Sequence, residues 1–483
     1  MYTNALLTDL YQLTMMQGLY LEGKHDQACV FDRYYRHNPF DGGYTVVAGL
    51  EHLIDYVKNI HFSDDDLAYL KSTGIFKEVF LDYLKQFHFT GSIYAMPEGT
   101  VAFPQEVLLR VETTKDESLL LETCMSMIMN HESLIATKAR RVRCVAGDDT
   151  LMEFGLRRAQ GASAGVYGAR SAMIGGFNGT SNMLSGAKFG IPVMGTMAHS
   201  WVMSFPTELE AFRTYAKHYP NSLILLADTY NTLKQGVPDA IAVFREMQEA
   251  GTLPSFYGIR LDSGDLAYLS KEAHKMFAAA GFPNAVIAAS NDLDENLIAE
   301  LKLQGCAISS WGVGTNLITA KDSPSMGGVF KMAGQYEGDR FVPKIKMSDN
   351  AEKISNPGRK NVLRIYDKAT GKMKADVIIL EGETIDPSKD LRLSSDKTPW
   401  RFRVIPAGSF TVRTMLQPVF VKGELVYTPP TLKEIMAYAD REIDTLWPEY
   451  KRLVNPETMW VQRSTRLSEL RHQILTEEAA HFQ

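Results

Sequence analysis

Polar side chains that each follow a short apolar run could act together on a charged small molecule. They lie between Leu151 and Thr315, where every run stops abruptly in polar or small residues. The set holds cations, carboxylates, hydroxyls and a single histidine: Arg157, Arg158, Ser181, His199, Asp228, Arg260, Asp262, Asn291 and Thr315. Because arginines and hydroxyls donate hydrogen bonds to phosphate and carboxylate oxygens, this combination favours a polyanionic ligand.

The apolar runs themselves must position these side chains. Seven occur in order: LMEFG, MIGGF, PVMGTMA, LILLA, YGI, VIAA and ISSW. Their starts lie roughly 19 to 35 residues apart, which is the spacing of repeated strand–helix units. The pattern predicts an α/β fold with an irregular β/α barrel, whose active-site residues gather at the carboxyl ends of the strands.

His199 follows the third run and Asp228 follows the fourth. Because the ends of neighbouring strands meet, we expect a carboxylate beside the imidazole, an arrangement suited to a general base or a phosphoryl acceptor. The competing interpretation is a core histidine whose hydrogen bonds are satisfied within the protein and which takes no part in chemistry. A metal site is disfavoured, since no second His or Cys stands nearby at ligand spacing.

The fifth run ends in GIRLDSGDL, where Arg260 and Asp262 share one face of a strand. They could form a structural ion pair. Alternatively, Arg260 binds a carboxylate or phosphate, and Asp262 or Asp265 binds ribose hydroxyls or the waters of Mg²⁺. Asp265 also stands where a helix begins and could be its N-cap.

Glycines after the last run suggest a phosphate site. In WGVGT, Gly312 and Gly314 precede Thr315, so backbone N–H groups at a helix start could approach an anion. Ser290 and Asn291 follow the sixth run and add donors. The alternative is that these glycines simply form a turn.

Composition narrows the class of protein. The 483-residue chain has a net charge of −6, which disfavours a nucleic-acid partner. The basic stretch Lys138–Arg158 is a local exception to this acidic balance, and a solvated helix face is one of its interpretations. The scattered cysteines, the lack of a signal-peptide pattern and the lack of a long apolar run favour a cytoplasmic protein without membrane contact: Cys29, Cys124, Cys144 and Cys306.

Three domains are predicted. Residues 1–130 mix helical and strand-like segments in an α+β domain, 131–350 carry the barrel, and 351–483 form a C-terminal domain of short strands and helices. That last domain is predicted to contain a hairpin turning at 369–371 and amphipathic helices over 431–446 and 467–480.

Two other functions fit a phosphate-binding barrel. A lyase or isomerase would normally need a lysine or a carboxylate pair at the strand ends, and no lysine stands at any of them. A barrel that only senses a metabolite would not need His199 beside a carboxylate.

Several motifs together resemble the nicotinate phosphoribosyltransferases, a type II phosphoribosyltransferase family. They are TDLYQLTMMQGL, FGLRRAQG, FNGTSN, GTMAHSWVMSF, LADTYNT, GIRLDSGDL and WGVGTNL. The resemblance covers nearly the whole chain. It implies that nicotinate, phosphoribosyl pyrophosphate, ATP and water give nicotinate mononucleotide, pyrophosphate, ADP and phosphate, the first step of NAD salvage from nicotinate. Mg²⁺ would arrive with the polyphosphates.

The resemblance also implies residue roles. His199 would become a phosphohistidine held by Asp228. The pyridine ring would lie between Phe154 and the partner subunit's Tyr11 in a homodimer with shared active sites. Thr196 and Arg260 would hold the nicotinate carboxylate. Phosphoribosyl pyrophosphate would contact the remaining strand-end residues: Arg157, Asp262, Ser290, Asn291, Gly312, Gly314 and Thr315.

Ser181 bears on the choice of base. Nicotinamide-using relatives carry an acidic residue after the Gly-Thr that aligns with Gly179-Thr180, where it can accept a hydrogen bond from the amide. A carboxylate there would repel the carboxylate of nicotinate. Serine at this position therefore favours the acid as substrate.

Overall fold

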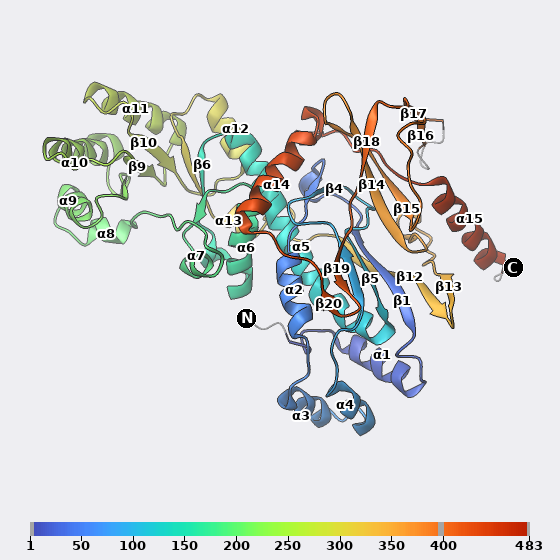
Figure 1. Cartoon of the computed structure of the whole chain (residues 1–483). Helices are drawn as coiled ribbons and strands as arrows, with labels where there is room; N and C mark the ends of the chain where they lie inside the picture. Colours follow the sequence, from blue (N-terminus) through green and yellow to red (C-terminus); the bar gives the residue numbers. More distant parts are fainter. Residues whose placement is uncertain (1–3, 395–399, 481–483) are drawn as a thin grey trace. The chain divides into compact units, whose positions relative to one another are not determined.

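The computed structural model describes residues 4–394 and 400–480. These group into two compact units, one formed by residues 1–137 with 325–483 and the other by 138–324 (Figure 1). The larger unit thus combines the N-terminal part of the chain with its C-terminal part. The division into three domains at 130 and 350 stays a prediction.

The smaller unit is built on one parallel sheet of six strands, in the order β7-β6-β11-β10-β9-β8. The strands are β6 (Thr150–Glu153), β7 (Gly179–Thr180), β8 (Leu223–Leu226), β9 (Tyr257–Leu261), β10 (Val286–Ala289) and β11 (Ser310–Val313). Every residue of β8 is buried, as expected for a strand covered on both faces. Gly258 permits the close pairing of β9 with β10, because a Cβ there would lie 1.9 Å from the Val286 carbonyl oxygen.

Helices connect these strands. They are α6 (Ala162–Ile174), α7 (Met183–Phe189), α8 (His199–Met203), α9 (Glu208–His218), α10 (Val237–Glu249), α11 (Leu266–Ala279), α12 (Glu295–Leu303) and α13 (Thr315–Ile318). Thr207, Asp265 and Asp294 cap the starts of α9, α11 and α12 by accepting backbone N–H groups. The repeated strand–helix pattern is confirmed, and its strands form a curled, open half-barrel.

The prediction of seven strands was wrong in two places. The third run contributes only a bridge between Val193 and Thr180, because Pro192 has no N–H to donate and the segment lies largely exposed. In the second run, Met173 and Ile174 end α6, and β7 begins later, at Gly179. A short apolar run fits a helix end as well as a buried strand, so periodicity could not separate them.

Three cations of the basic stretch 138–158 lie buried near the end of α5 (Lys115–Ala146), so a solvated face is wrong for Lys138, Arg140 and Arg141. The cations at 157 and 158 are exposed. Lys138 Nζ lies 2.7 Å from Glu295 Oε2, and Arg141 Nε lies 2.6 Å from Glu295 Oε1. The Glu295 side chain is fully buried on α12. Arg140 Nη2 donates to the carbonyl oxygen of Ile174, the last residue of α6. These cations therefore face a carboxylate and a helix end inside the smaller unit.

A seven-stranded sheet forms the centre of the larger unit, in the order β13-β12-β1-β5-β3-β19-β20. Its strands are β1 (Ala28–Tyr35), β3 (Ser92–Ala95), β5 (Leu109–Thr114), β12 (Gly328–Glu337), β13 (Arg340–Pro343), β19 (Gln417–Val421) and β20 (Glu424–Leu425). β1 pairs with β5 and β12, so segments from both ends of the chain share this sheet. The helices that precede α5 are α1 (Leu10–Leu21), α2 (Leu50–Asn59), α3 (Asp64–Ser72) and α4 (Glu78–Leu84).

The predicted C-terminal hairpin and helices are confirmed. β14 (Lys360–Asp367) and β15 (Met373–Leu380) form the hairpin, flanked by β18 (Phe410–Thr414) and β21 (Val461–Arg463). The helices are α14 (Leu432–Thr445) and α15 (Thr465–Ala480). Two further strand pairs are β16 (Leu391–Ser394) with β17 (Phe402–Ile405), and β2 (Thr45–Val46) with β4 (Val101–Ala102).

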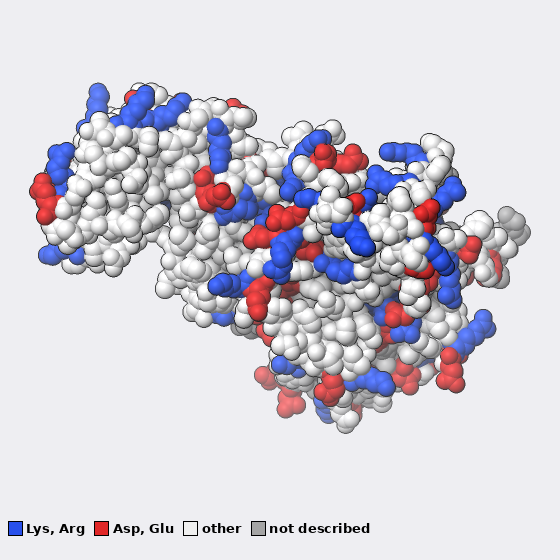
Figure 2. Space-filling model, turned by 45° about the horizontal axis from the view of Figure 1, so that its top comes forward, with Lys and Arg blue, Asp and Glu red and all other residues white. Residues whose placement is uncertain are grey.

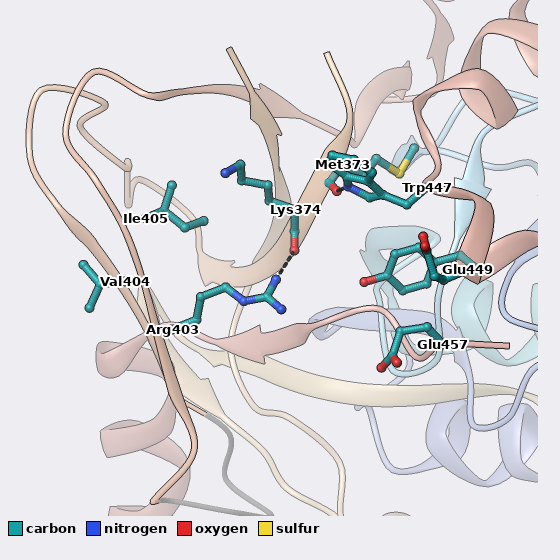
Figure 3. A pocket seen from close by; sticks show the side chains of 9 residues that line it. Met373, Lys374, Arg403, Val404, Ile405, Trp447, Glu449 and Glu457 are labelled. Carbon is teal, nitrogen blue, oxygen red and sulfur yellow. Dashed lines mark hydrogen bonds between the residues drawn. The ribbon is translucent and has the colours of Figure 1, made fainter. Parts of the chain in front are cut away.

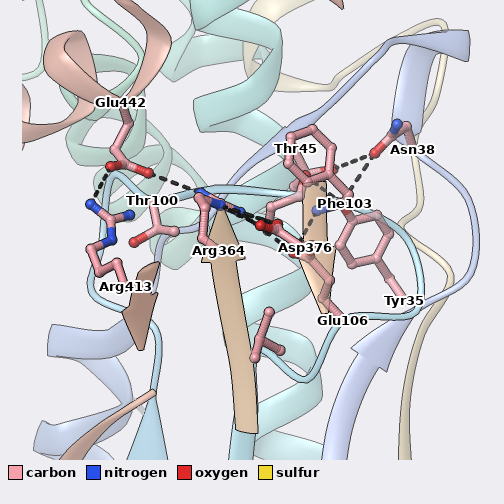
Figure 4. Close-up of polar contacts among 12 residues, drawn as sticks. Tyr35, Asn38, Thr45, Thr100, Phe103, Glu106, Arg364, Asp376, Arg413 and Glu442 are labelled. Atoms are coloured by element: carbon pink, nitrogen blue, oxygen red, sulfur yellow. Dashed lines mark hydrogen bonds and ion pairs between the residues drawn. The ribbon is translucent and has the colours of Figure 1, made fainter. Parts of the chain in front are cut away.

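A buried ionic network joins these C-terminal elements to one another (Figure 4). Arg364 on β14 binds Asp376 on β15 through Nη2 at 2.7 Å and Glu442 on α14 through Nη1 at 3.1 Å. Arg413 on β18 reaches the same Glu442 at 2.8 Å. Burial raises the pKa of Glu106 well above its usual value, and the adjacent Asp376 raises it further. The network fixes α14 on the sheet that contains β14.

Charges of both signs are interspersed on the face shown in Figure 2, where no continuous basic surface stands out. None of the helices in the described ranges is both long and apolar enough to cross a membrane.

Candidate functional site

His199 is the first residue of α8, and its imidazole is half-buried between two strand-end residues. Nδ1 lies 3.1 Å from the Thr229 hydroxyl after β8. Nε2 lies 3.7 Å from Asp262 Oδ2 after β9. The ring therefore has a hydroxyl on one side and a carboxylate on the other, and its side chain is 39% exposed, so His199 is not a core residue.

The carboxylate beside His199 belongs to Asp262, not to Asp228 as the sequence suggested. Asp228 Oδ2 accepts the backbone N–H of Asp262 at 2.9 Å and the Ser263 hydroxyl at 2.6 Å. The cause is the parallel register, which pairs Leu226 with Arg260 and so carries Asp228 to the loop of Asp262. Asp228 thus holds the residue that faces the histidine.

Arg260 and Thr196 meet at one backbone carbonyl. Arg260 Nη2 donates to the Met197 oxygen at 3.0 Å, and the Thr196 hydroxyl donates to the same oxygen at 3.3 Å. Burial lowers the pKa of Arg260, while Asp262 and Asp228 oppose that change. Within the described residues, Arg260 Nε is buried without a hydrogen-bond partner. An unsatisfied buried donor of this kind suits an anionic ligand.

Ser290 and Asn291 occupy the end of β10. The buried Ser290 hydroxyl donates to Asp262 Oδ1, so the Asp262 carboxylate lies between Ser290 and His199. Asn291 and Asp292 have φ angles of 90° and 45°, a left-handed turn that asparagine and aspartate tolerate better than most residues. Asn316 Nδ2 holds this turn by donating to the Asp292 carbonyl at 2.7 Å.

Gly312 makes room for an aromatic ring. A Cβ on Gly312 would lie 2.5 Å from two ring carbons of Phe154, so the half-buried ring lies against the backbone of β11. Gly314 has φ −116° and ψ −98° and precedes Thr315, where α13 begins. Phe154 is therefore positioned by β11, and the glycine pattern serves the ring as well as the turn.

Three of the other predicted residues lie in the smaller unit, and the fourth lies in the larger unit. Ser181 follows β7 and donates its backbone N–H to the Glu153 carbonyl at 3.0 Å, and Arg157 is exposed in the turn after β6. Asp265 caps α11 by accepting the Tyr268 N–H at 2.9 Å, so the capping interpretation is confirmed. Tyr11 lies on α1 in the larger unit and is 51% exposed.

Sequence reasoning missed Thr229, Glu153 and Glu208. Thr229 directly follows Asp228, which was predicted as a site residue, and only its hydroxyl could have indicated a role. Glu153 sits inside an apolar strand and Glu208 follows a helix cap, where an acidic residue looks structural. Both Glu208 side-chain oxygens are buried without a hydrogen-bond partner within the described residues.

Glu208 predicts a pH effect on stability. Burial, followed by Asp239 and Asp228, raises the pKa of Glu208 to about 7. Because this folded-state pKa lies above the unfolded value, the contribution of Glu208 is full below the unfolded pKa and is lost as pH rises through about 7. We expect Glu208→Gln to reduce the fall in Tm between pH 6 and pH 8.5 by about 2–4 °C.

Glu210→Gln is the matched control, since Glu210 is exposed on the same helix. Thermal unfolding followed by circular dichroism gives the comparison. Parallel Tm-against-pH curves for Glu208→Gln and the unmodified protein would contradict the assignment.

No group of three or more His, Cys, Asp or Glu side chains suited to a metal occurs in the described part of the chain. Asp228 Oδ1 is nevertheless buried without a hydrogen-bond partner there, next to the loop of Asp262. This unsatisfied oxygen fits a water-bridged Mg²⁺ accompanying a polyphosphate better than it fits a dedicated metal centre.

A cavity of about 450 Å³ in the larger unit contains none of the predicted site residues (Figure 3). Trp447 Nε1 donates to the Met373 carbonyl at 2.9 Å beside it. Arg403 points toward the Lys374 carbonyl from another side. The polar residues that could do chemistry lie elsewhere, at the strand ends of the smaller unit.

Comparisons with known proteins identify the family of the chain. Three family models match the chain: the nicotinate phosphoribosyltransferase N-terminal domain at residues 6–130, the nicotinate phosphoribosyltransferase family at 150–334, and the nicotinate phosphoribosyltransferase C-terminal domain at 359–471. The chain belongs to the nicotinate phosphoribosyltransferase family. The sequence resemblance is thereby confirmed.

Members of this family resemble the chain along almost its whole length. A nicotinate phosphoribosyltransferase from Bacillus subtilis is 42% identical, over 97% of this chain and 96% of the relative. One from Dictyostelium discoideum is 35% identical, over 98% and 88%. The crystal structure of human nicotinic acid phosphoribosyltransferase superposes with a TM-score of 0.85 at 28% identity, covering 96% of this chain and 99% of that one. The strand-end residues of this family member all lie within the segment 150–334.

Proposed function

We propose that this protein transfers the phosphoribosyl group of phosphoribosyl pyrophosphate to nicotinate and couples the transfer to ATP hydrolysis. Its products would be nicotinate mononucleotide, pyrophosphate, ADP and phosphate, in NAD salvage. Family membership supports the transfer. The observation that supports the coupling is His199, placed between Thr229 and Asp262 on the edge that also carries Arg260.

Nicotinate would bind against Phe154. The ring packs on Gly312 and offers a flat apolar face to the pyridine. Arg260 keeps a buried N–H donor that could bind the nicotinate carboxylate, and the Thr196 hydroxyl contacts the same Met197 carbonyl as Arg260. Ser181 is uncharged and would not repel that carboxylate. The partner subunit's Tyr11 would cover the other face, which makes the protein a homodimer with shared sites.

Phosphoribosyl pyrophosphate would occupy the ends of β9 to β11. Ser290, Asn291, Gly312, Gly314 and Thr315 offer hydroxyl and backbone donors to the 5′-phosphate, and the exposed Arg157 would meet the pyrophosphate. Asp262 would bind ribose hydroxyls. Displacement at the anomeric carbon breaks the bond to pyrophosphate, so the protein mainly positions the base and stabilises the leaving group.

His199 would accept the γ-phosphoryl group of ATP. One imidazole nitrogen forms the bond to phosphorus as the bond to ADP breaks, and the Asp262 carboxylate stabilises the positive charge of the ring. Water later hydrolyses the phosphohistidine. Mg²⁺ bound to the polyphosphates would neutralise their charge, held through water by Asp262 or Asp265. Coupling requires that the phosphorylated and free forms bind substrates and products differently.

A product assay tests the transfer. The protein is incubated with phosphoribosyl pyrophosphate and either nicotinate, nicotinamide or quinolinate, each with and without ATP. Of the three bases, we expect only nicotinate to give a mononucleotide, and we expect ATP to raise the yield of that product. Failure to form nicotinate mononucleotide under both conditions would sink the proposal, and binding without turnover would favour the sensing barrel.

A labelling experiment tests the histidine. With γ-labelled ATP and Mg²⁺, we expect acid-labile label on the unmodified protein and none on His199→Ala, which should keep the transfer that does not need ATP. Equal labelling of both proteins would exclude His199 as the acceptor. The shared site is checked by mixing Tyr11→Ala with His199→Ala subunits, since verified heterodimers should regain ATP-stimulated transfer of the phosphoribosyl group to nicotinate.

A further inference from the structure

We propose that Glu153 is a positioning residue that sets the spacing between Phe154, which would lie against the pyridine ring, and Ser181, which would lie near the nicotinate carboxylate. The proposal rests on the function proposed above. Glu153 is the last residue of β6, and its side chain is fully buried. It stands directly before Phe154 in the chain, while Ser181 stands directly after the neighbouring strand β7.

The carboxylate of Glu153 ties two strand-end loops together. Oε1 accepts the backbone N–H of Gly155, which fixes the turn that carries Phe154 on one side and Arg157 on the other. Oε2 accepts the Thr180 hydroxyl at 2.6 Å, which fixes the end of β7. One side chain therefore bridges the loop of the aromatic ring and the strand that ends at Ser181.

The backbone of Glu153 adds a second tie to the same loop. Its carbonyl oxygen accepts the Ser181 N–H at 3.0 Å and lies 3.4 Å from the Ser181 hydroxyl. Thr180 Oγ1 also accepts the Asn182 N–H at 3.0 Å, so the bridge continues to the cap of α7. Movement of the Glu153 side chain would thus move Ser181 relative to Phe154.

The surroundings of Glu153 explain why a carboxylate is needed. Two donors converge on it, and an ionised carboxylate accepts from both, whereas an amide offers one acceptor oxygen. Burial raises the pKa of Glu153, while the hydrogen bonds from Thr180 and Gly155 lower it. Gly155 lets the carboxylate approach, because a Cβ there would lie 2.8 Å from Glu153 Oε1 and 2.5 Å from Ile318 Cβ.

A purely structural role would lower stability without selecting among substrates, so the test separates the two. In Glu153→Gln we expect the KM for nicotinate to rise about tenfold, with the KM for phosphoribosyl pyrophosphate within about twofold of the parent. Thr180→Val removes the hydroxyl that donates to Glu153 Oε2 and should likewise raise the KM for nicotinate more than the KM for phosphoribosyl pyrophosphate. The double variant should be little worse than either single one.

Glu117→Gln is the matched control in the larger unit. Glu117 is also a buried carboxylate that accepts a backbone N–H and a threonine hydroxyl from Thr90, at 3.1 and 2.6 Å. It should lose stability without a change in the KM for nicotinate. Tm is measured for all variants.

Parallel increases in both KM values, or a loss of kcat that only follows Tm, would overturn the positioning role. If Glu153→Gln does not fold, Thr180→Val decides, and an unchanged KM for nicotinate in that variant refutes the proposal. Absence of nicotinate transfer by the unmodified protein is a separate result, which would refute the proposed function itself.

Discussion

Arg260→Lys is expected to lower kcat/KM for nicotinate on the order of 100-fold while leaving the protein folded. The Arg260 guanidinium holds the Met197 carbonyl with one nitrogen and keeps a buried Nε donor without a partner within the described residues. A planar guanidinium can donate hydrogen bonds to the Met197 carbonyl and to a substrate carboxylate at the same time. The compact ammonium of lysine cannot span both acceptors.

Steady-state kinetics with nicotinate as the varied substrate would measure this loss. Arg213→Lys is the matched control, because Arg213 forms an exposed ion pair with Glu246 at 2.6 Å in the same unit. That control should retain nearly full activity, since exposed pairs contribute little. An Arg260→Lys variant with more than half the parental kcat/KM would show that the guanidinium does not hold the carboxylate of nicotinate.

Glu295→Ala is expected to lower the free energy of unfolding of the smaller unit by about 3–5 kcal/mol. Glu295 is fully buried and faces both Lys138 and Arg141 at hydrogen-bond distance. Removal of the carboxylate takes away the buried counter-ion that these two cations share. Asp322, which is partly exposed, lies 2.7 Å from Lys138 and would remain beside it.

Urea unfolding monitored by tryptophan fluorescence would give the change in free energy. Glu246→Ala breaks the exposed pair with Arg213 and should cost less than about 1 kcal/mol. Equal costs for Glu295→Ala and Glu246→Ala would mean that the buried cluster contributes no more than a surface pair.

The strand–helix repeat was readable from sequence because parallel strands buried on both faces are continuous apolar runs. LILLA, YGI and VIAA all lie in or at the ends of strands, whereas MIGGF ended a helix and PVMGTMA supplied only a bridge. Apolar content marks burial, and burial alone does not separate a strand from the end of a helix.

The predicted site residues largely follow the strand ends, but their partners could not be derived from the sequence. His199 was expected beside Asp228. The register of β8 on β9 instead places Asp228 against the backbone of Asp262, and the Asp262 carboxylate faces the imidazole of His199. Pairing of this kind depends on where two strands are aligned and on which way each loop turns after its last hydrogen bond. Neither is encoded within a single segment.

The sequence by itself determined the family, the parallel strand–helix order and the kinds of side chain at the strand ends, because these depend on local periodicity and residue chemistry. Only the tertiary structure decided that the sheet stays open, that Lys138 and Arg141 are buried on Glu295, and that Glu153 ties Phe154 to Ser181. Each of these depends on contacts between residues far apart in the chain. Such contacts form only when register, burial and charge neutralisation are satisfied together.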